Sequence, residues 1–215
     1  PRSLPRRCSA CASNRAAQAR KPYPDPVFRL TRPSDAAIRA HLQRQAELPF
    51  SYPEVGATVD LDRAPARYQI DRNRSVLGHG EACFEAARSA SRNWRMFELG
   101  WAEICWPDSP IKDGAIVGIL AHTLGLWSLS ACRIVYVIDE PDRFGFAYGT
   151  LPDHAGRGEE RFLIEREPDG RVCYDLRAFS RPGLVITHLG YFWMRILQRR
   201  FARDSMAVMR NTVRP

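Results

Sequence analysis

The stretch Leu189–Arg210 reads LGYFWMRILQRRFARDSMAVMR and predicts a long helix with one conspicuous face. At about 100° per residue its apolar side chains fall in a single arc, made up of Leu189, Trp193, Ile196, Leu197, Phe201 and Val208. Arg200 and Asp204 fall in the same arc, four residues apart, so they can form an ion pair along the helix. Burying such a pair is costly unless each charge is compensated. We therefore expect this face to close a partly polar cavity.

Upstream of the helix, short apolar segments alternate with turn signals such as PDSPIKDG, DEPD and PDHAGRG. The predicted elements are a short helix over 35–47 capped by Ser34, a strand over 68–77, a helix over 81–96, six strands over 98–106, 114–122, 131–139, 143–151, 159–167 and 171–180, and the long helix over 184–211. The connections between the six strands are too short for parallel crossovers, so these strands are expected to be antiparallel. An α+β fold follows, in which a curved sheet wraps around the C-terminal helix and leaves room for a ligand.

Composition divides the chain into three parts. Residues 1–29 form a basic, Arg- and Ser-rich arm and a Pro-rich linker, which we expect to be disordered. Residues 30–66 supply the N-terminal helix and a lead-in loop, and residues 67–212 form the ligand-binding domain. The net charge of +8 comes from the two ends, because 1–21 contain six basic residues and no acid and 191–215 contain six arginines and one acid. A charge spread in this way argues against a nucleic-acid partner.

The location expected from the sequence is cytoplasmic. No apolar run is long enough to span a bilayer, and the N-terminus lacks the apolar stretch of a secretory signal. A transit peptide remains an alternative for the Arg- and Ser-rich arm. The six cysteines are scattered and indicate free thiols in a reducing compartment. The arginines on the flank of the last helix are typical of a solvated face or of peripheral membrane contact. Oligomeric state is left open.

The wall of the cavity is expected to be aromatic. In the segment RFGFAYGT, bulky rings alternate with small residues, so one face carries bulk and the other permits close approach. The aromatic candidates are Trp101, Trp127, Tyr136, Phe146, Tyr148, Tyr174 and Trp193. Two interpretations of the Arg200–Asp204 pair are open. It locks the helix to the sheet, or Arg200 faces a carboxylate, phenolate or phosphate of the ligand with Asp204 beside it.

Two histidines are candidates for acid–base catalysis, because an imidazole titrates near neutral pH. They are His122, at the end of a strand, and His188, near the start of the long helix; simple hydrogen bonding or exposure is the alternative for both. Glu159 and Glu160 are adjacent and point to opposite faces of a strand, which argues against an acid–base pair. Neither the HGEAC segment nor the single CxxC at Cys8 has further ligands at zinc spacing. We therefore expect no metal and no cofactor.

A family resemblance rests on seven ordered strings: SYPEVGAT, LGHGEACFEAAR, NWRMFELGW, CRIVYVIDE, RFGFAYGTLPDHAGRGEERF, AFSRP and RRFARDSMAVM. Over about residues 30–210 the chain resembles a bacterial and plant family defined only as a domain of unknown function. That family is similar to the helix-grip superfamily of the major birch pollen allergen (Bet v 1-like), START domains and polyketide aromatase/cyclases. The resemblance implies a helix-grip fold and a cavity for an apolar or amphipathic small molecule, and it implies no particular activity.

The sequence is compatible with three functions. The first is binding of a lipid, polyketide or isoprenoid-like molecule between the sheet and the last helix. The second is an enzyme of aromatase/cyclase or dehydratase type, in which a His or Tyr moves protons on the bound molecule. The third is a scaffold whose basic ends dock on acidic surfaces.

Overall fold

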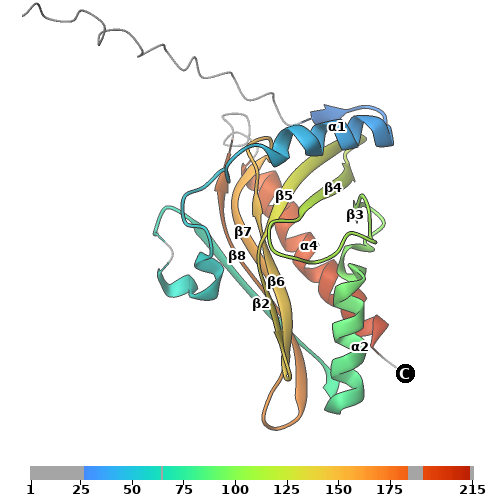
Figure 1. Ribbon diagram of the computed structural model, residues 1–215, viewed down its shortest axis with the longest axis vertical. Helices are drawn as coiled ribbons and strands as arrows, with labels where there is room; N and C mark the ends of the chain where they lie inside the picture. The colour runs from blue at the N-terminus through green and yellow to red at the C-terminus, as the bar shows by residue number, and fades with distance from the viewer. Residues whose placement is uncertain (1–26, 64, 184–190, 214–215) are drawn as a thin grey trace, which may run out of the picture.

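A computed structural model describes residues 27–63, 65–183 and 191–213 of the chain (Figure 1). Its elements, in chain order, are β1 (Val27–Arg29), α1 (Asp35–Ala46), η1 (Ala57–Val59), η2 (Leu61–Arg63), β2 (Gln69–His79), α2 (Gly80–Arg92), η3 (Arg95–Phe97), β3 (Ala102–Ile104), β4 (Ile116–Thr123), β5 (Leu126–Glu140), β6 (Arg143–Thr150), β7 (Gly156–Arg166), β8 (Arg171–Pro182) and α4 (Tyr191–Thr212). Within these ranges no helix is long and apolar enough to cross a membrane.

One antiparallel sheet forms the body of the molecule. Its strands lie in the order β2-β8-β7-β6-β5-β4-β3, and β1 pairs with β5. Figure 1 shows the sheet curling around α4, with α2 beside the C-terminal half of that helix. We call the side that faces α4 the inner face and the opposite side, which carries α1, η1 and η2, the outer face. The prediction of an α+β helix-grip fold is confirmed, including the antiparallel strands.

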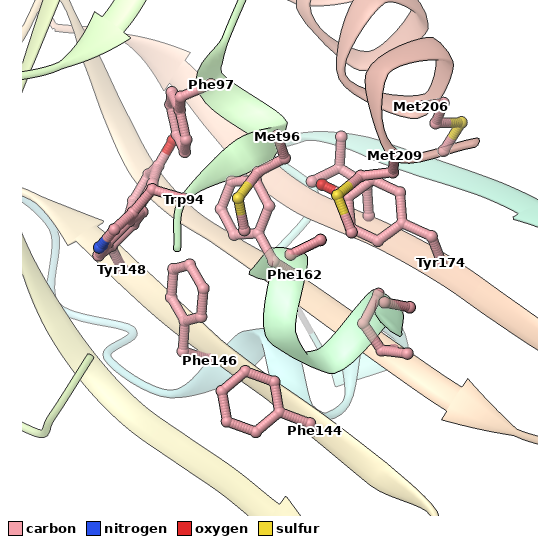
Figure 2. Close-up of a cluster of buried hydrophobic side chains, with 14 of the residues drawn as sticks. Trp94, Met96, Phe97, Phe144, Phe146, Tyr148, Phe162, Tyr174, Met206 and Met209 are labelled. Carbon is pink, nitrogen blue, oxygen red and sulfur yellow. The ribbon is translucent and has the colours of Figure 1, made fainter. Parts of the chain in front are cut away.

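The inner face is tightly packed where α2, η3 and the C-terminal half of α4 meet the sheet (Figure 2). The rings of Phe146 and Phe162 stack with centroids 5.1 Å apart, and Trp94 meets Phe146 edge-on at 4.9 Å. From α4, Met206 and Met209 are buried in the same cluster. Aromatic contacts and flexible methionines fill space efficiently, so this half of the interface between helix and sheet is solid.

The outer face is covered by segments that precede β2. Ile38 and Leu42 of α1 pack on the apolar side chains of β4 and β5. Ser34 caps α1 as expected, its hydroxyl accepting from the amide of Ala37 at 3.3 Å. Tyr52 packs edge-on against Phe179 of β8. The lead-in loop is therefore part of the packed domain.

Several boundaries differ from those expected. Val27–Arg29, assigned to the linker, pairs with β5 over 127–129 because β6 covers β5 only from Cys132 onward and leaves that edge free. The strand expected over 98–106 shrinks to β3, since a turn at Gly100 (φ +72°) interrupts its first half. The helix expected over 81–96 ends at Arg92 and is followed by η3. The expected start of the long helix at 184 falls outside the described residues.

Candidate ligand-binding cavity

A cavity of about 250 Å³ lies between the inner face of the sheet and the N-terminal half of α4. It exists because small residues replace bulky ones at this end of the interface, namely Ala121, Gly156, Ala178 and Ala202. Apolar side chains dominate the wall; they are Phe97, Ile119, Leu176, Met194, Leu197 and Phe201. A mainly apolar hollow with a few polar groups is the usual form of a small-molecule site.

A carboxyl group, that of Glu160 on β7, projects into this cavity. The register of β6 and β7 places Glu160 directly opposite Tyr148, whose phenol donates to Oε2 at 2.7 Å. Burial raises the pKa of Glu160 to about 7; the hydrogen bond from Tyr148 opposes this rise, and the charge of Asp71 adds to it. Burial also raises the pKa of Tyr148 well above its ordinary value, so the phenol stays protonated. Glu160 can accept a hydrogen bond from a ligand when ionised and donate one when protonated.

Further polar groups line the same end of the cavity. Asp71 of β2 accepts two hydrogen bonds from the guanidinium of Arg195, both 2.6 Å long. Gln198 accepts from Arg195 at 2.6 Å and donates to Ser180 at 3.0 Å. These contacts fix the N-terminal half of α4 against β2 and β8 at this end of the cavity.

His154, in the turn between β6 and β7, also lines the cavity. Its Nδ1 lies 3.0 Å from the amide nitrogen of Gly156. Burial lowers the pKa of His154 to about 4, so the imidazole is neutral at physiological pH. A neutral imidazole can exchange a hydrogen bond with a ligand without carrying charge.

The neighbouring Glu159 points to the outer face, as alternation requires, and is fully occupied. Its Oε2 accepts from the phenol of Tyr52 and the amide of Gly56, both at 2.7 Å. Its Oε1 accepts from the amide of Thr58 at 3.0 Å and from the hydroxyl of the same residue. This buried carboxylate binds the lead-in loop to the sheet and has no group left for a ligand.

The Arg200–Asp204 ion pair forms, at 3.3 Å, but the expectation that it lies inside the apolar face is wrong. The side chain of Arg200 is 43% exposed and that of Asp204 is 25% exposed. Asp204 accepts from the indole of Trp101 at 3.0 Å and from Arg203 at 2.9 Å, while the guanidinium of Arg200 lies 4.6 Å from the Trp101 ring centre. The ion pair therefore fixes the position of the Trp101 side chain, which forms part of the cavity wall.

Of the aromatic candidates, Trp101 and Tyr148 line the cavity. Phe146 and Tyr174 belong to the solid half of the inner face, where the Tyr174 phenol lies 2.9 Å from Ser205 Oγ. Trp193 is 41% exposed because it lies on the side of α4 that turns away from the sheet. The expectation that these three form the cavity wall is not met.

Tyr136 lies on the outer face, contrary to expectation. A β-bulge between Ile134 and Tyr136 shifts the register, so Ile134 faces Tyr148 on the inner face whereas Tyr136 pairs with Ala147. The Tyr136 phenol lies 2.8 Å from the hydroxyl of Thr58, beside the site that holds the lead-in loop.

His122 lies outside the cavity. Its ring stacks on Trp127 with centroids 4.5 Å apart, and both residues line a separate groove of about 280 Å³ on the far side of Trp101. His188 is outside the described residues. Glu160 therefore replaces His122 as the candidate acid–base group at the cavity, and His154 is a second candidate.

Sequence reasoning passed over Glu160 and His154. Alternation along the strand predicts the opposite orientation of Glu159 and Glu160, but it does not show which of the two carboxyl groups faces a cavity. The signal that was available is cross-strand alignment: the short PDHAGR turn between two strands places a carboxyl opposite Tyr148 on the face that carries rings.

Within the described ranges, no cluster of three or more His, Cys, Asp or Glu side chains is placed to hold a metal ion. The cysteines that the structure describes are free thiols, at Cys83, Cys105, Cys132 and Cys173. The residues that line the cavity offer hydrogen bonds, proton exchange at Glu160 and apolar contact.

The chain is similar to proteins of known sequence across most of its length. A family model described as "Domain of unknown function (DUF1990)" matches residues 51–208. A "UPF0548 protein" of Deinococcus radiodurans is 40% identical, covering 82% of this chain and 94% of that protein. A "UPF0548 protein" of Dictyostelium discoideum is 35% identical, covering 87% of this chain and 96% of that protein.

Solved structures give a more distant likeness. Ara h 8.0201 is 13% identical with a TM-score of 0.45, covering 68% of this chain and 97% of that chain. The di-domain ARO/CYC StfQ from the steffimycin biosynthetic pathway is 10% identical with a TM-score of 0.47, covering 73% of this chain and 54% of that chain.

Proposed function

We propose that this chain, which belongs to the family described as a domain of unknown function (DUF1990), binds a hydrophobic or amphipathic small molecule between its sheet and its C-terminal helix. A lipid, polyketide or isoprenoid-like compound fits this description. The observation that carries the proposal is a mainly apolar cavity of about 250 Å³ with one carboxyl group projecting into it. The residues that line it fall within 67–212, the segment proposed as the ligand-binding domain, and we propose a cytoplasmic location.

Apolar contact supplies the affinity in this proposal. Leu176 on β8 and Leu197 and Phe201 on α4 face the hollow from opposite sides, so an aliphatic or aromatic body is enclosed by the sheet and the helix. Each buried CH₂ group contributes about 0.8 kcal/mol. At about 250 Å³ the cavity lies just below the usual range for ligand sites, which favours a compact ligand.

The structure suggests a direct test by filling the hollow. Ala178 of β8 lies between Asp71 and Glu160 in the register of the sheet and lines the cavity. We expect Ala178→Leu to weaken binding of the neutral fluorescent probe N-phenylnaphthylamine by about tenfold or more, because the new side chain occupies its space. Ala86→Leu, on the exposed side of α2, is the matched control and should leave binding unchanged.

Native mass spectrometry of the purified protein provides a second measurement. A copurifying small molecule that is lost in Ala178→Leu and retained in Ala86→Leu would identify the ligand and support the proposal. Probe affinity that is equal in wild type and Ala178→Leu would contradict it, provided that both variants melt cooperatively.

A second function is favoured by the position of Glu160, whose carboxyl projects into the cavity and accepts a hydrogen bond from the Tyr148 phenol. A general acid or base works best when its pKa is close to the working pH, and burial raises the pKa of Glu160 to about 7. This function is proton transfer to or from a bound carbonyl compound. Glu160 then takes the acid–base role that the sequence assigned to His122 in the enzymatic alternative.

Deuterium incorporation into acetophenone, followed by NMR in deuterated buffer, measures such proton transfer directly. Faster exchange with wild type than with Glu160→Gln would support the enzyme. Exchange at the buffer rate with wild type would count against it and leave the binding proposal intact.

A further inference from the structure

The charge inside the cavity is opposite to the one expected from the sequence. Arg200, the anticipated partner for an anionic ligand, is 43% exposed and lies over Trp101. The charged group that projects into the hollow is instead Glu160, for which no ion pair forms among the described residues. The cavity therefore presents a hydrogen-bond acceptor, the carboxyl of Glu160, where a hydrogen-bond donor, the guanidinium of Arg200, was expected.

The other charged groups near the cavity do not neutralise Glu160. Asp71 and Arg195 are bonded to each other. Arg199 is exposed at the rim. Arg157 also lines the cavity, but it is three residues from Glu160 on an unbroken strand, so its side chain leaves the strand on the opposite face. The neutral imidazole of His154 and the phenol of Tyr148, which already donates to the carboxyl, carry no charge that could neutralise it.

We infer that the cavity selects amphipathic ligands whose polar end is a hydrogen-bond donor, a hydroxyl or a primary ammonium group bound to Glu160, and that it discriminates against ligands ending in a carboxylate. This inference rests on the proposed binding function and specifies the chemistry of its ligand. Tyr148 donates to Oε2 alone, so Oε1 of Glu160 has its acceptor capacity free for the ligand.

The discrimination has a simple electrostatic basis. Two carboxylates brought together in an apolar enclosure repel each other with little solvent screening, and neither gains a partner. An ammonium or hydroxyl group at the same position instead gains a charge-assisted hydrogen bond. The apolar body of either ligand makes the same contacts, so the difference in affinity arises at the polar end.

Three probes of equal chain length test the inference: octylamine, octanol and octanoate, titrated calorimetrically against the full chain at about pH 8. We expect octylamine to bind about tenfold or more tightly than octanoate, with octanol between them. In Glu160→Gln the amine-to-acid preference should fall to about threefold or less. Glu165→Gln, on the same strand but facing outward beside Arg74 and Arg143, is the matched control and should keep the wild-type preference.

A change of pH gives an independent arm of the same test. Near pH 5.5 the carboxyl of Glu160 is protonated, since its pKa is about 7, so the preference for octylamine should shrink in wild type and stay constant in Glu160→Gln. Should Glu160→Gln not fold, Tyr148→Phe replaces it: this variant retains the carboxylate, frees its second oxygen and should keep or increase the preference.

The outcomes separate this inference from the binding proposal. Failure of all three probes to bind would contradict the proposed function itself. Binding of octanol, with octanoate as tight as octylamine, would overturn the inference and leave the binding function standing. A preference that survives unchanged in Glu160→Gln would also overturn the inference, because its source would then lie elsewhere.

Discussion

Two neighbouring carboxyl groups on β7 behave in opposite ways. Glu159 points to the outer face, where Tyr52, Gly56 and Thr58 provide four donors. Glu160 points to the inner face, where one phenol donates to it and the rest of its surroundings form a hollow. The comparison shows that residue type does not assign a role. The number of donors supplied by the surrounding fold separates a structural carboxylate from one that is available to a ligand.

The strongest test of this comparison is Glu159→Gln. An amide turns its NH₂ group toward donors that previously met a carboxylate oxygen, so buried polar groups are left unsatisfied. We expect a loss of about 3–4 kcal/mol in the free energy of unfolding, measured by urea denaturation. Glu165→Gln, half-buried on the same strand, should change it by less than about 1 kcal/mol. Equal effects of the two substitutions would mean that the outer-face contacts of Glu159 are not what secures the lead-in loop.

The corresponding test of Glu160 is the pH dependence of stability. Its pKa is raised from 4.5 to about 7 in the folded protein, so the folded state binds the proton more tightly than the unfolded state does. The stabilisation is fully present below pH 4.5 and is lost as the pH rises through 7, by about 3 kcal/mol at most.

His41 and His154 have pKa values lowered to about 4 and impose the opposite trend, so the informative quantity is the difference between wild type and Glu160→Gln. We expect wild type to lose stability relative to Glu160→Gln between about pH 5 and 8. Parallel pH profiles for the two proteins would show that Glu160 is solvated like an ordinary surface carboxyl.

A pair of glycines extends the comparison to packing. At Gly149, on the outer face, an added Cβ would lie 2.0 Å from the phenol oxygen of Tyr52, which cannot retreat because it donates to Glu159. We expect Gly149→Ala to lower the free energy of unfolding by about 2 kcal/mol. At Gly156, which borders the cavity, the added atom would find its nearest neighbour at 3.7 Å. Gly156→Ala should therefore be close to neutral in the same measurement, and a larger loss at Gly156 would reverse the comparison.

The smallest effect is expected at the rim. Asp204 is partly exposed and accepts from Trp101, Arg200 and Arg203, so Asp204→Ala should cost about 1 kcal/mol in thermal or urea denaturation. A pair buried in the interior would instead give about 3–5 kcal/mol. A loss of that size would place the pair in the interior and contradict the exposure of Arg200.

Much of the fold could be read from local patterns. The alternation in RFGFAYGT assigned Phe144, Phe146 and Tyr148 to one face and small residues to the other, and the packing of Tyr52 over Gly149 explains why the second face needs them. Short connections required antiparallel strands, and the period of the last segment required a helix. These features depend on residues close together in the sequence, where dihedral preferences and side-chain period act directly.

The candidate site could not be predicted in the same way. A helical wheel gives the direction in which Arg200 points from the axis of α4. It does not show whether the sheet covers α4 on that side. The sequence therefore predicts that the Arg200–Asp204 pair is buried, whereas the structure places it at the rim. The predicted position of Tyr136 is wrong because of a single β-bulge, which reverses the direction of every side chain that follows it in β5. Neither the extent of the sheet over α4 nor the bulge in β5 is indicated by a local sequence pattern.

By itself, the sequence determined the order of the elements, the antiparallel pairing, the last helix and the opposite directions of Glu159 and Glu160. The tertiary structure alone decided which end of the interface between helix and sheet is solid, and which of the two carboxyl groups is supplied with donors. The reason is that volume and solvation are sums over contacts between distant segments. Residues 52–58 reach Glu159 across about a hundred positions of the chain, while no bulky side chain from any described segment fills the space in front of Glu160.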